Sequence, residues 1–146
     1  MGRLAAAFEA ARSEGRAALI GYLPAGFPSA EESAEFMKAM VAGGVDIVEV
    51  GMPYSDPVMD GPVIQAAANT ALAGGATMHT ALACVTAVHD AGAVACVMSY
   101  WNPIERYGVT QFASDLSDAG GAAVITPDLS PQEAHAWTQA SDAAGV

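Results

Sequence analysis

Short apolar runs alternate with amphipathic segments along this chain of 146 residues, and the alternation limits the possible folds more than any other feature. Each run has the length of one strand and is followed by a segment with helical spacing. We predict strands at 17–23, 46–50, 93–99 and 122–126. Strands that alternate with helices form parallel sheets with right-handed crossovers, so the pattern predicts an α/β fold.

The segments between the strands begin and end with typical helix signals. A leading amphipathic helix is expected over 3–13. Ser29 and Glu32 have the spacing of a capping box and predict a second helix. The face of this helix that we expect to be buried contains Phe36, Met37, Met40 and Val41.

Further helices are expected at 63–73, from Thr77 onward, and at 109–119. Ser130, followed by Pro131 and then Glu133, predicts the start of a last helix that runs to about Ala143. The two Gly-Gly pairs of the chain are better interpreted as helix ends than as phosphate-binding loops; they lie at 74–75 and 120–121.

The four strand–helix units leave two architectures open, a barrel and an open doubly wound sheet. No G-x-G-x-x-G motif follows the first strand, which argues against a dinucleotide-binding fold. The chain is 53% hydrophobic, enough for a core, and its length corresponds to one domain or part of one. A complete (β/α)8 barrel usually needs about 200 residues or more.

One carboxylate interrupts the second apolar run. Glu49 shares a strand face with Ile47 and Gly51, because side chains alternate along a strand. If that face is the interior of a barrel, apolar surroundings raise the pKa of Glu49 and allow it to act as a proton donor. The alternative is a glutamate that reaches solvent at the strand end or pairs with a distant basic residue.

The loop after this strand contributes two more carboxylates, Asp56 and Asp60. Both have ordinary roles available, because Asp before Pro and Asp-Gly are common turn formers. The three histidines lack metal-ligand spacing, and the two cysteines, Cys84 and Cys96, are expected to be free core thiols.

The formal net charge of −11 argues against nucleic acid and anionic membranes as partners. No apolar stretch approaches membrane-spanning length, and no signal peptide precedes the first helix, so we expect a cytoplasmic protein.

Four sequence blocks together resemble one family. They read E-V-G-M-P-Y-S-D-P-V-M-D-G-P at 49–62, G-Y-L-P-A-G-F-P at 21–28, M-S-Y-W-N-P-I at 98–104 and I-T-P-D-L at 125–129. In these motifs and in their order the chain resembles the α subunit of tryptophan synthase. The resemblance implies a (β/α)8 TIM barrel. Residues 1–146 are expected to form the N-terminal half of this one domain, its first four βα units after a leading helix, with no second domain.

The resemblance also implies roles for individual residues. Glu49 is expected to protonate C3 of the indole ring, and Asp60 to stabilise the positive charge that develops on its N1. The implied substrate-binding residues are Tyr22, Met98 and Tyr100. The implied partner contacts are Pro53, Ser55, Asp56 and Asp128. Family members often have Phe at the position of Tyr22 and Leu at that of Met98.

The implied reaction is the retro-aldol cleavage of indole-3-glycerol phosphate to indole and glyceraldehyde 3-phosphate. It needs no metal or cofactor in this chain, since pyridoxal phosphate belongs to the β subunit of the expected α2β2 heterotetramer. The alternative is a truncated half-barrel that is catalytically weak or inactive and serves only as an interaction or vestigial fragment. Exposed strand edges and an uncovered apolar inner face also predict that the chain associates with itself or with a complementary half, or else folds poorly.

Overall fold

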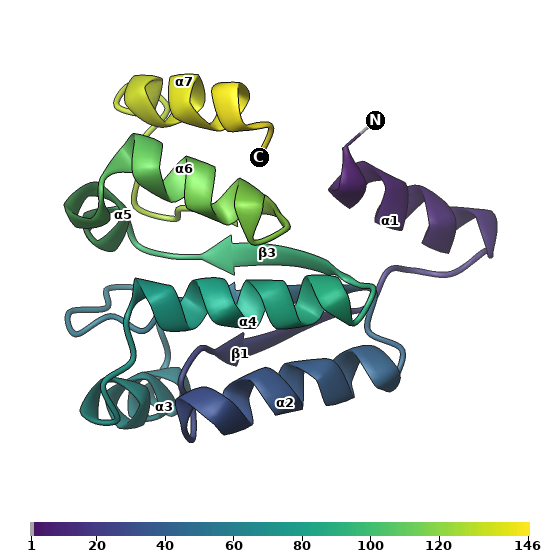
Figure 1. Ribbon diagram of the computed structural model, residues 1–146, viewed down its shortest axis with the longest axis horizontal. Coiled ribbons are helices and arrows are strands. Elements are labelled where there is room, and N and C mark those ends of the chain that lie inside the picture. The colour runs from purple at the N-terminus through teal and green to yellow at the C-terminus, as the bar shows by residue number, and fades with distance from the viewer. Residues whose placement is uncertain (1) are drawn as a thin grey trace.

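The computed structural model describes residues 2–146 and shows four strands that are separated by one or two helices and preceded by a leading helix (Figure 1). The strands are β1 (Ile20–Pro24), β2 (Ile47–Gly51), β3 (Val94–Met98) and β4 (Gly121–Ile125). The helices are α1 (Arg3–Ser13), α2 (Ala30–Ala42), α3 (Pro62–Ala73), α4 (Met78–Asp90), α5 (Trp101–Tyr107), α6 (Val109–Asp118) and α7 (His135–Ala144).

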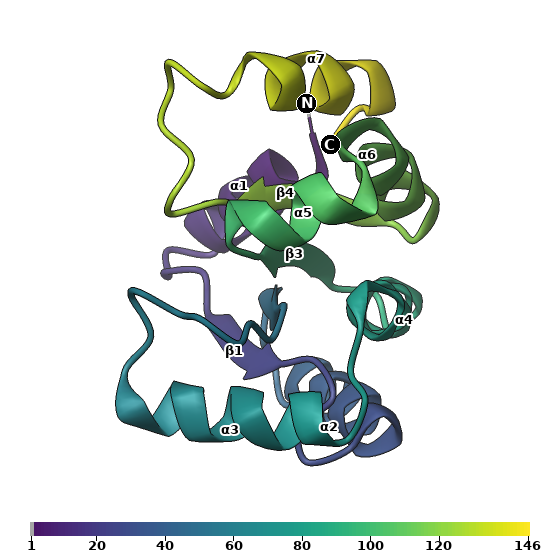
Figure 2. The same cartoon turned by 90° about the vertical axis from the view of Figure 1, so that its left-hand side faces the viewer.

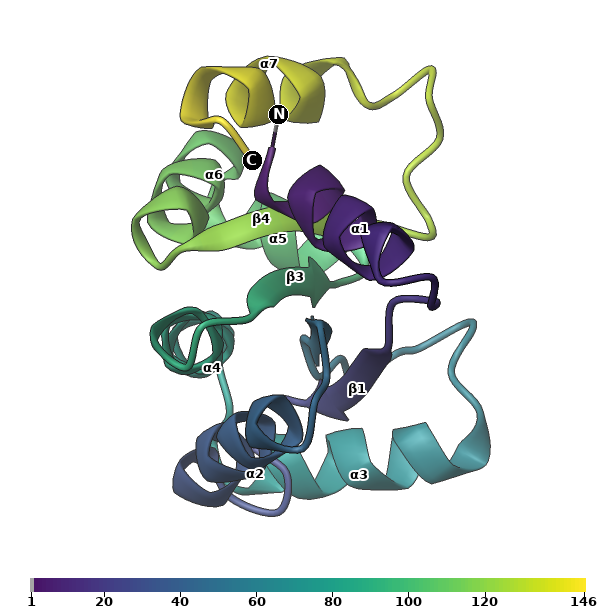
Figure 3. The ribbon, with the colours of Figure 1, turned by 90° about the vertical axis from the view of Figure 1, so that its right-hand side faces the viewer.

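The four strands form one parallel sheet in the chain order β1-β2-β3-β4. Helices α2, α4 and α6 line one side of this sheet, whereas α1 lies on the opposite side (Figure 3). Helix α3 packs beside β1, and α7 packs on α6 (Figures 1 and 2). The sheet therefore has an outer face covered by helices and an inner face that α1 covers only in part.

The core lies between the outer face of the sheet and the covering helices. Side chains that are fully buried there include Val48, Val50, Val97, Met37, Val85, Val88, Phe112 and Leu116. Because side chains alternate along β2, burying Val48 and Val50 on the outer face turns Ile47, Glu49 and Gly51 to the inner face. This alternation places Glu49 inside the curve of the sheet.

The predicted α/β class and most predicted elements are confirmed. The Ser29 hydroxyl accepts a hydrogen bond from the Glu32 amide at the start of α2, as expected. The first strand begins at Ile20 rather than at 17, however. Phe36 was wrongly assigned to the buried face of α2: it is 47% exposed, whereas Met37 is fully buried.

Two helix predictions near α5 and α7 differ from the structure. Helix α5, which contains Pro103, was not predicted, because it is short and has no amphipathic repeat. The last helix begins at His135 and not next to Ser130. The Glu133 amide bonds to the Ser130 carbonyl, three residues back, so these residues form turns in place of the first helical turn.

Within residues 2–146, no helix taken singly has the length and apolar character of a membrane span; only α3 and α4 together do, and they are bent by 108°.

Candidate active site at the carboxyl ends of the strands

Glu49 occupies the middle of β2 on the inner face of the sheet. Its register neighbours are Tyr22 on β1 and Cys96 on β3. A cavity of about 220 Å³ lies against this face, and Leu4 and Phe8 of α1 form its other wall. Burial in this apolar setting raises the pKa of Glu49 above the usual range of a glutamate, in the direction expected from the sequence.

Tyr22 lies on β1 beside Glu49, and its side chain reaches toward the carboxyl end of β2. Its phenol ring sits directly over Gly51, where any side chain would collide with it. The pKa of Tyr22 is raised to about 12, first by burial and then by the negative charges of Asp60 and Glu49. The phenol of Tyr22 therefore stays protonated at neutral pH.

The Asp60 carboxylate is hydrogen-bonded by Tyr100, the residue that precedes α5. The Tyr100 hydroxyl donates a hydrogen bond to Asp60 Oδ1 over 3.1 Å and accepts one from the Met59 amide over 2.9 Å. On the other side of the loop, Gln65 Nε2 donates to the Asp60 carbonyl over 2.8 Å. The loop thus presents a half-buried Asp60 carboxylate that is hydrogen-bonded to Tyr100.

Met98 is the last residue of β3 and is the register partner of Gly51. Its side chain therefore lies on the inner face at the same end as Tyr22. Between the end of β1 and α3, Tyr22 also borders an apolar cavity of about 330 Å³, with Phe27 and Ile64. This end of the sheet therefore combines two carboxylates with apolar surfaces that fit an aromatic ring.

The rim around these residues is joined by hydrogen bonds between segments distant in sequence. Asn102 Nδ2 donates to the Tyr54 hydroxyl over 2.8 Å, and the backbone N–H of Trp101 donates to Asp128 Oδ1 over 2.9 Å. The loop 52–61, the start of α5 and the segment after β4 therefore form one continuous edge, as expected for segments that all follow strand ends.

The residues implied as partner contacts differ in their exposure. Ser55 and Asp56 are exposed and hydrogen-bonded to each other, and Asp128 is exposed beside Trp101. Pro53 is buried instead, so its ring supports the loop.

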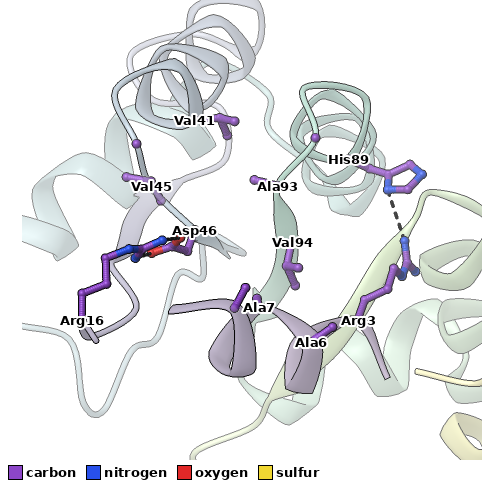
Figure 4. A pocket seen from close by; sticks show the side chains of 13 residues that line it. Arg3, Ala6, Ala7, Arg16, Val41, Val45, Asp46, His89, Ala93 and Val94 are labelled. Atoms are coloured by element: carbon purple, nitrogen blue, oxygen red, sulfur yellow. Dashed lines mark hydrogen bonds and ion pairs between the residues drawn. The ribbon is translucent and has the colours of Figure 1, made fainter. Parts of the chain in front are cut away.

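A larger cavity, of about 650 Å³, lies at the opposite, amino-terminal ends of the strands (Figure 4). Its polar side chains bind one another. Arg16 forms two hydrogen bonds of 2.7 and 2.8 Å to Asp46, and Arg3 contacts His89 at 3.2 Å (Figure 4). Arg3 also donates to the Gly121 carbonyl over 2.7 Å. We interpret this end as structural. Arg3 attaches α1 to β4, and Arg16 attaches the segment after α1 to the start of β2.

Three residues at the site were not identified from the sequence. Cys96 beside Glu49 could have been found from the alternation in β3, because residues 94, 96 and 98 share a face. Tyr54 and Asn102 had no such signal, because their meeting depends on two loop conformations. Among the described residues, no group of three or more histidine, cysteine, aspartate or glutamate side chains is arranged to hold a metal ion.

The parallel sheet in chain order, its helices on the outer side and its polar side chains at the carboxyl ends together define half of a (β/α)8 barrel. A family model described as tryptophan synthase alpha chain matches residues 8–146. The chain belongs to the tryptophan synthase alpha chain family.

Individual relatives agree with this assignment. The tryptophan synthase alpha chain of Thermobifida fusca is 65% identical over 136 residues, which is 93% of this chain and 50% of the relative. A crystal structure of tryptophan synthase from M. tuberculosis has a TM-score of 0.97 at 52% identity, covering 99% of this chain and 58% of that one. Tryptophan synthase subunit alpha from Legionella pneumophila has a TM-score of 0.94 at 33% identity, covering 100% and 56%. The chain spans about half the length of the curated relatives it matches.

Proposed function

We propose that this chain supplies the acid–base residues for cleaving indole-3-glycerol phosphate into indole and glyceraldehyde 3-phosphate. The observation that carries the proposal is that Glu49 lies on the inner face of β2 as the register partner of Tyr22, whose ring lies over Gly51, where the loop that presents the Asp60 carboxylate begins. An inner-face glutamate with a raised pKa suits proton donation, and a nearby carboxylate suits the stabilisation of developing positive charge.

In the proposed step, Glu49 gives its proton to C3 of the indole ring. The positive charge that results on the ring nitrogen is stabilised by Asp60. The bond from C3 to the glycerol carbon then breaks, and its electron pair returns to the ring. The hydroxyl group on that carbon gives its proton to the Glu49 carboxylate, which regains its protonated form, and becomes the aldehyde. Neither an oxidant nor an organic cofactor is needed in this half-reaction.

Apolar surfaces next to the carboxylates support an aromatic substrate. The cavity beside Tyr22 is lined mainly by aliphatic and aromatic side chains of β1 and α3. Because Tyr22 keeps its proton at neutral pH, it adds no third negative charge near the substrate. An anionic phosphate ester could therefore be accepted beside Glu49 once this carboxyl is protonated.

The test is an indole-release assay on the chain combined with the second half of the Thermobifida fusca relative. Glu49→Gln should keep the fold and lower indole release by about 100- to 10,000-fold, the range typical of general acid–base groups. Asp60→Asn should lower it less, since the proton donor remains. The matched control is Glu31→Gln, which changes an exposed glutamate on α2.

The pH dependence gives a second measurement in the same assay. A raised pKa keeps Glu49 protonated to a higher pH than an ordinary glutamate, and indole release should fall as the pH rises through that pKa. Near-normal turnover by Glu49→Gln would refute the assignment. No indole from the unchanged assembly would favour the alternative of a non-catalytic interaction fragment.

We also propose that a β-type subunit covers the edge formed by the loop 53–60, the residues after Tyr100, and Asp128. Exposed Ser55 and Asp56 lie on this edge. Hydrogen exchange with and without a tryptophan synthase β subunit tests the proposal. Protection should appear in these segments, and protection confined to α1 and the amino-terminal ends of the strands would contradict it.

A further inference from the structure

We propose that Tyr54 is a positioning residue for the Asp60 carboxylate and acts through Tyr100. The inference deepens the proposed function and rests on it for the catalytic role of Asp60. The four residues that carry it form a chain of contacts from the exposed rim to the site: Asn102, Tyr54, Tyr100 and Asp60.

The orientation of the Asp60 carboxylate depends on a single side chain. Among the described residues, the Tyr100 hydroxyl is the one donor that reaches the Asp60 carboxylate. The loop 52–61 contains no helix or strand, so no regular backbone bonding fixes the direction of this carboxylate. Its position therefore follows that of the Tyr100 hydroxyl.

The Tyr100 hydroxyl donates one hydrogen bond and accepts another. It donates to Asp60 Oδ1 over 3.1 Å and accepts from the Met59 amide over 2.9 Å. A phenol has one proton to donate, and the acceptor bond from Met59 directs that proton toward Asp60. The hydrogen bond from the Met59 N–H therefore reports directly on the position of the Tyr100 hydroxyl.

Tyr54 holds the ring that carries this hydroxyl. The Tyr54 and Tyr100 rings contact each other with centroids 5.3 Å apart and planes tilted by 37°. This separation lies within the range of favourable aromatic pairs. Tyr54 is fixed in turn by its hydroxyl, which accepts a hydrogen bond of 2.8 Å from Asn102. The loop is therefore attached to the start of α5 through Tyr54, Met59 and Asp60.

Through these contacts Tyr54 affects the position of the Asp60 carboxylate, although it forms no hydrogen bond to Asp60 or Glu49. Without the Tyr54 ring, the Tyr100 ring loses a neighbour on one face and gains rotational freedom. A positioned group that becomes mobile loses part of its effect, because catalysis depends on a narrow range of geometries. The site residues therefore include an aromatic pair whose outer member lies on the rim.

The test measures exchange of the Met59 amide by NMR on the chain 1–146. Tyr100→Phe removes the acceptor and should speed Met59 exchange by about two- to tenfold, the effect of one ordinary hydrogen bond. Tyr54→Ala should speed it by a similar factor, and Tyr54→Phe, which keeps the ring, by less. Tyr107→Phe is the matched control, because it removes another tyrosine–carboxylate bond, to Asp115, away from the site.

Asn102→Ala and Tyr54→Phe break the same hydrogen bond, so their combined effect on exchange should be no larger than either alone. Unchanged amide exchange at Val85 in the core of α4 shows that each variant is folded. Met59 exchange that is identical in Tyr54→Ala and in the unchanged chain would overturn the inference, whatever the activity.

Activity in the assembly described above separates the two proposals. Tyr54→Ala should lower kcat more than it raises KM, and Tyr54→Phe should recover most of the loss. If Asp60→Asn leaves indole release unchanged, the catalytic role of Asp60 fails, while the exchange result still decides whether Tyr54 positions it.

Discussion

At the scale of single residues, the two ends of the sheet shift carboxylate pKa values in opposite directions. Burial raises the pKa of Glu49 at the site, whereas hydrogen bonds from Arg16 and from the Leu19 amide lower the pKa of Asp46 to about 2. The raised value means that folded Glu49 binds its proton more tightly than the unfolded chain does. Its contribution to stability is therefore lost as the pH rises through the raised pKa.

The low pKa of Asp46 has the opposite consequence and gives a prediction. Its contribution to stability is present above the unfolded pKa, which is near 4, and is lost as the pH falls toward 2. Asp46→Asn should therefore be less stable than the unchanged chain at pH 7, with a difference that shrinks in acid. Urea unfolding at pH 7 and pH 3 measures this, with Asp118→Asn as an exposed control. An equal loss at both pH values would contradict the mechanism.

Candidate site residues could be identified from the sequence only where a local pattern exposed them. Glu49 interrupts an apolar run, so alternation places it on one face with Ile47 and Gly51, and the structure shows that this face is the inner one. Asp60 offered no such evidence, and its hydrogen bond to Tyr100 spans 40 residues of sequence. The resemblance to a family singled it out, and the structure supplies the contact that holds it.

At the scale of helices and strands, local capping signals were reliable when the tertiary structure agreed with them. Ser29 caps α2 as expected, and Thr77 with Thr80 forms a capping box at the start of α4. Ser130 and Glu133 have the same spacing and bond to each other, yet they close a turn ahead of α7. A capping pattern therefore predicts a local bond but does not guarantee that a helix follows at once.

The capping box of α4 can be tested directly. Thr77→Ala removes the hydroxyl that accepts from the helix amide, and it should lower stability by about 1 kcal/mol. Thr86→Ala on the same helix is the matched control, because its hydroxyl bonds only to the carbonyl of Leu82 one turn earlier. Urea unfolding of both variants measures the difference. A larger loss for Thr86→Ala than for Thr77→Ala would contradict the capping role.

At the scale of the whole molecule, the sheet has two open edges. β1 and β4 each have one strand neighbour, and large apolar side chains are exposed along them, with Ile20 at 47% and Ile125 at 45%. The inner face is less open than expected from the sequence, because α1 packs against it. Ile47 is 1% exposed and Cys96 is 4% exposed. The edges, more than the inner face, are therefore the surfaces that favour association.

We predict that the chain 1–146 associates with itself in solution, because unpaired apolar edge strands recruit other strands. Light scattering should give a mass above that of one chain. Ile125→Lys places a charge on the β4 edge and should shift the population toward monomer, whereas Val63→Lys on the exposed start of α3 should not. A monodisperse monomer for the unchanged chain would contradict the prediction.

The sequence by itself determined the properties that depend on neighbouring residues: the order of strands and helices, most helix starts and the face that Glu49 shares with Ile47 and Gly51. These follow from side-chain periodicity and backbone hydrogen bonding over a few residues. The tertiary structure decided which loops meet. The bond from Asn102 to Tyr54 spans 48 residues, and the cover that α1 gives the inner face joins residues further apart still. No local pattern specifies such contacts, because they form only when the parallel sheet brings the ends of separate strands to one edge.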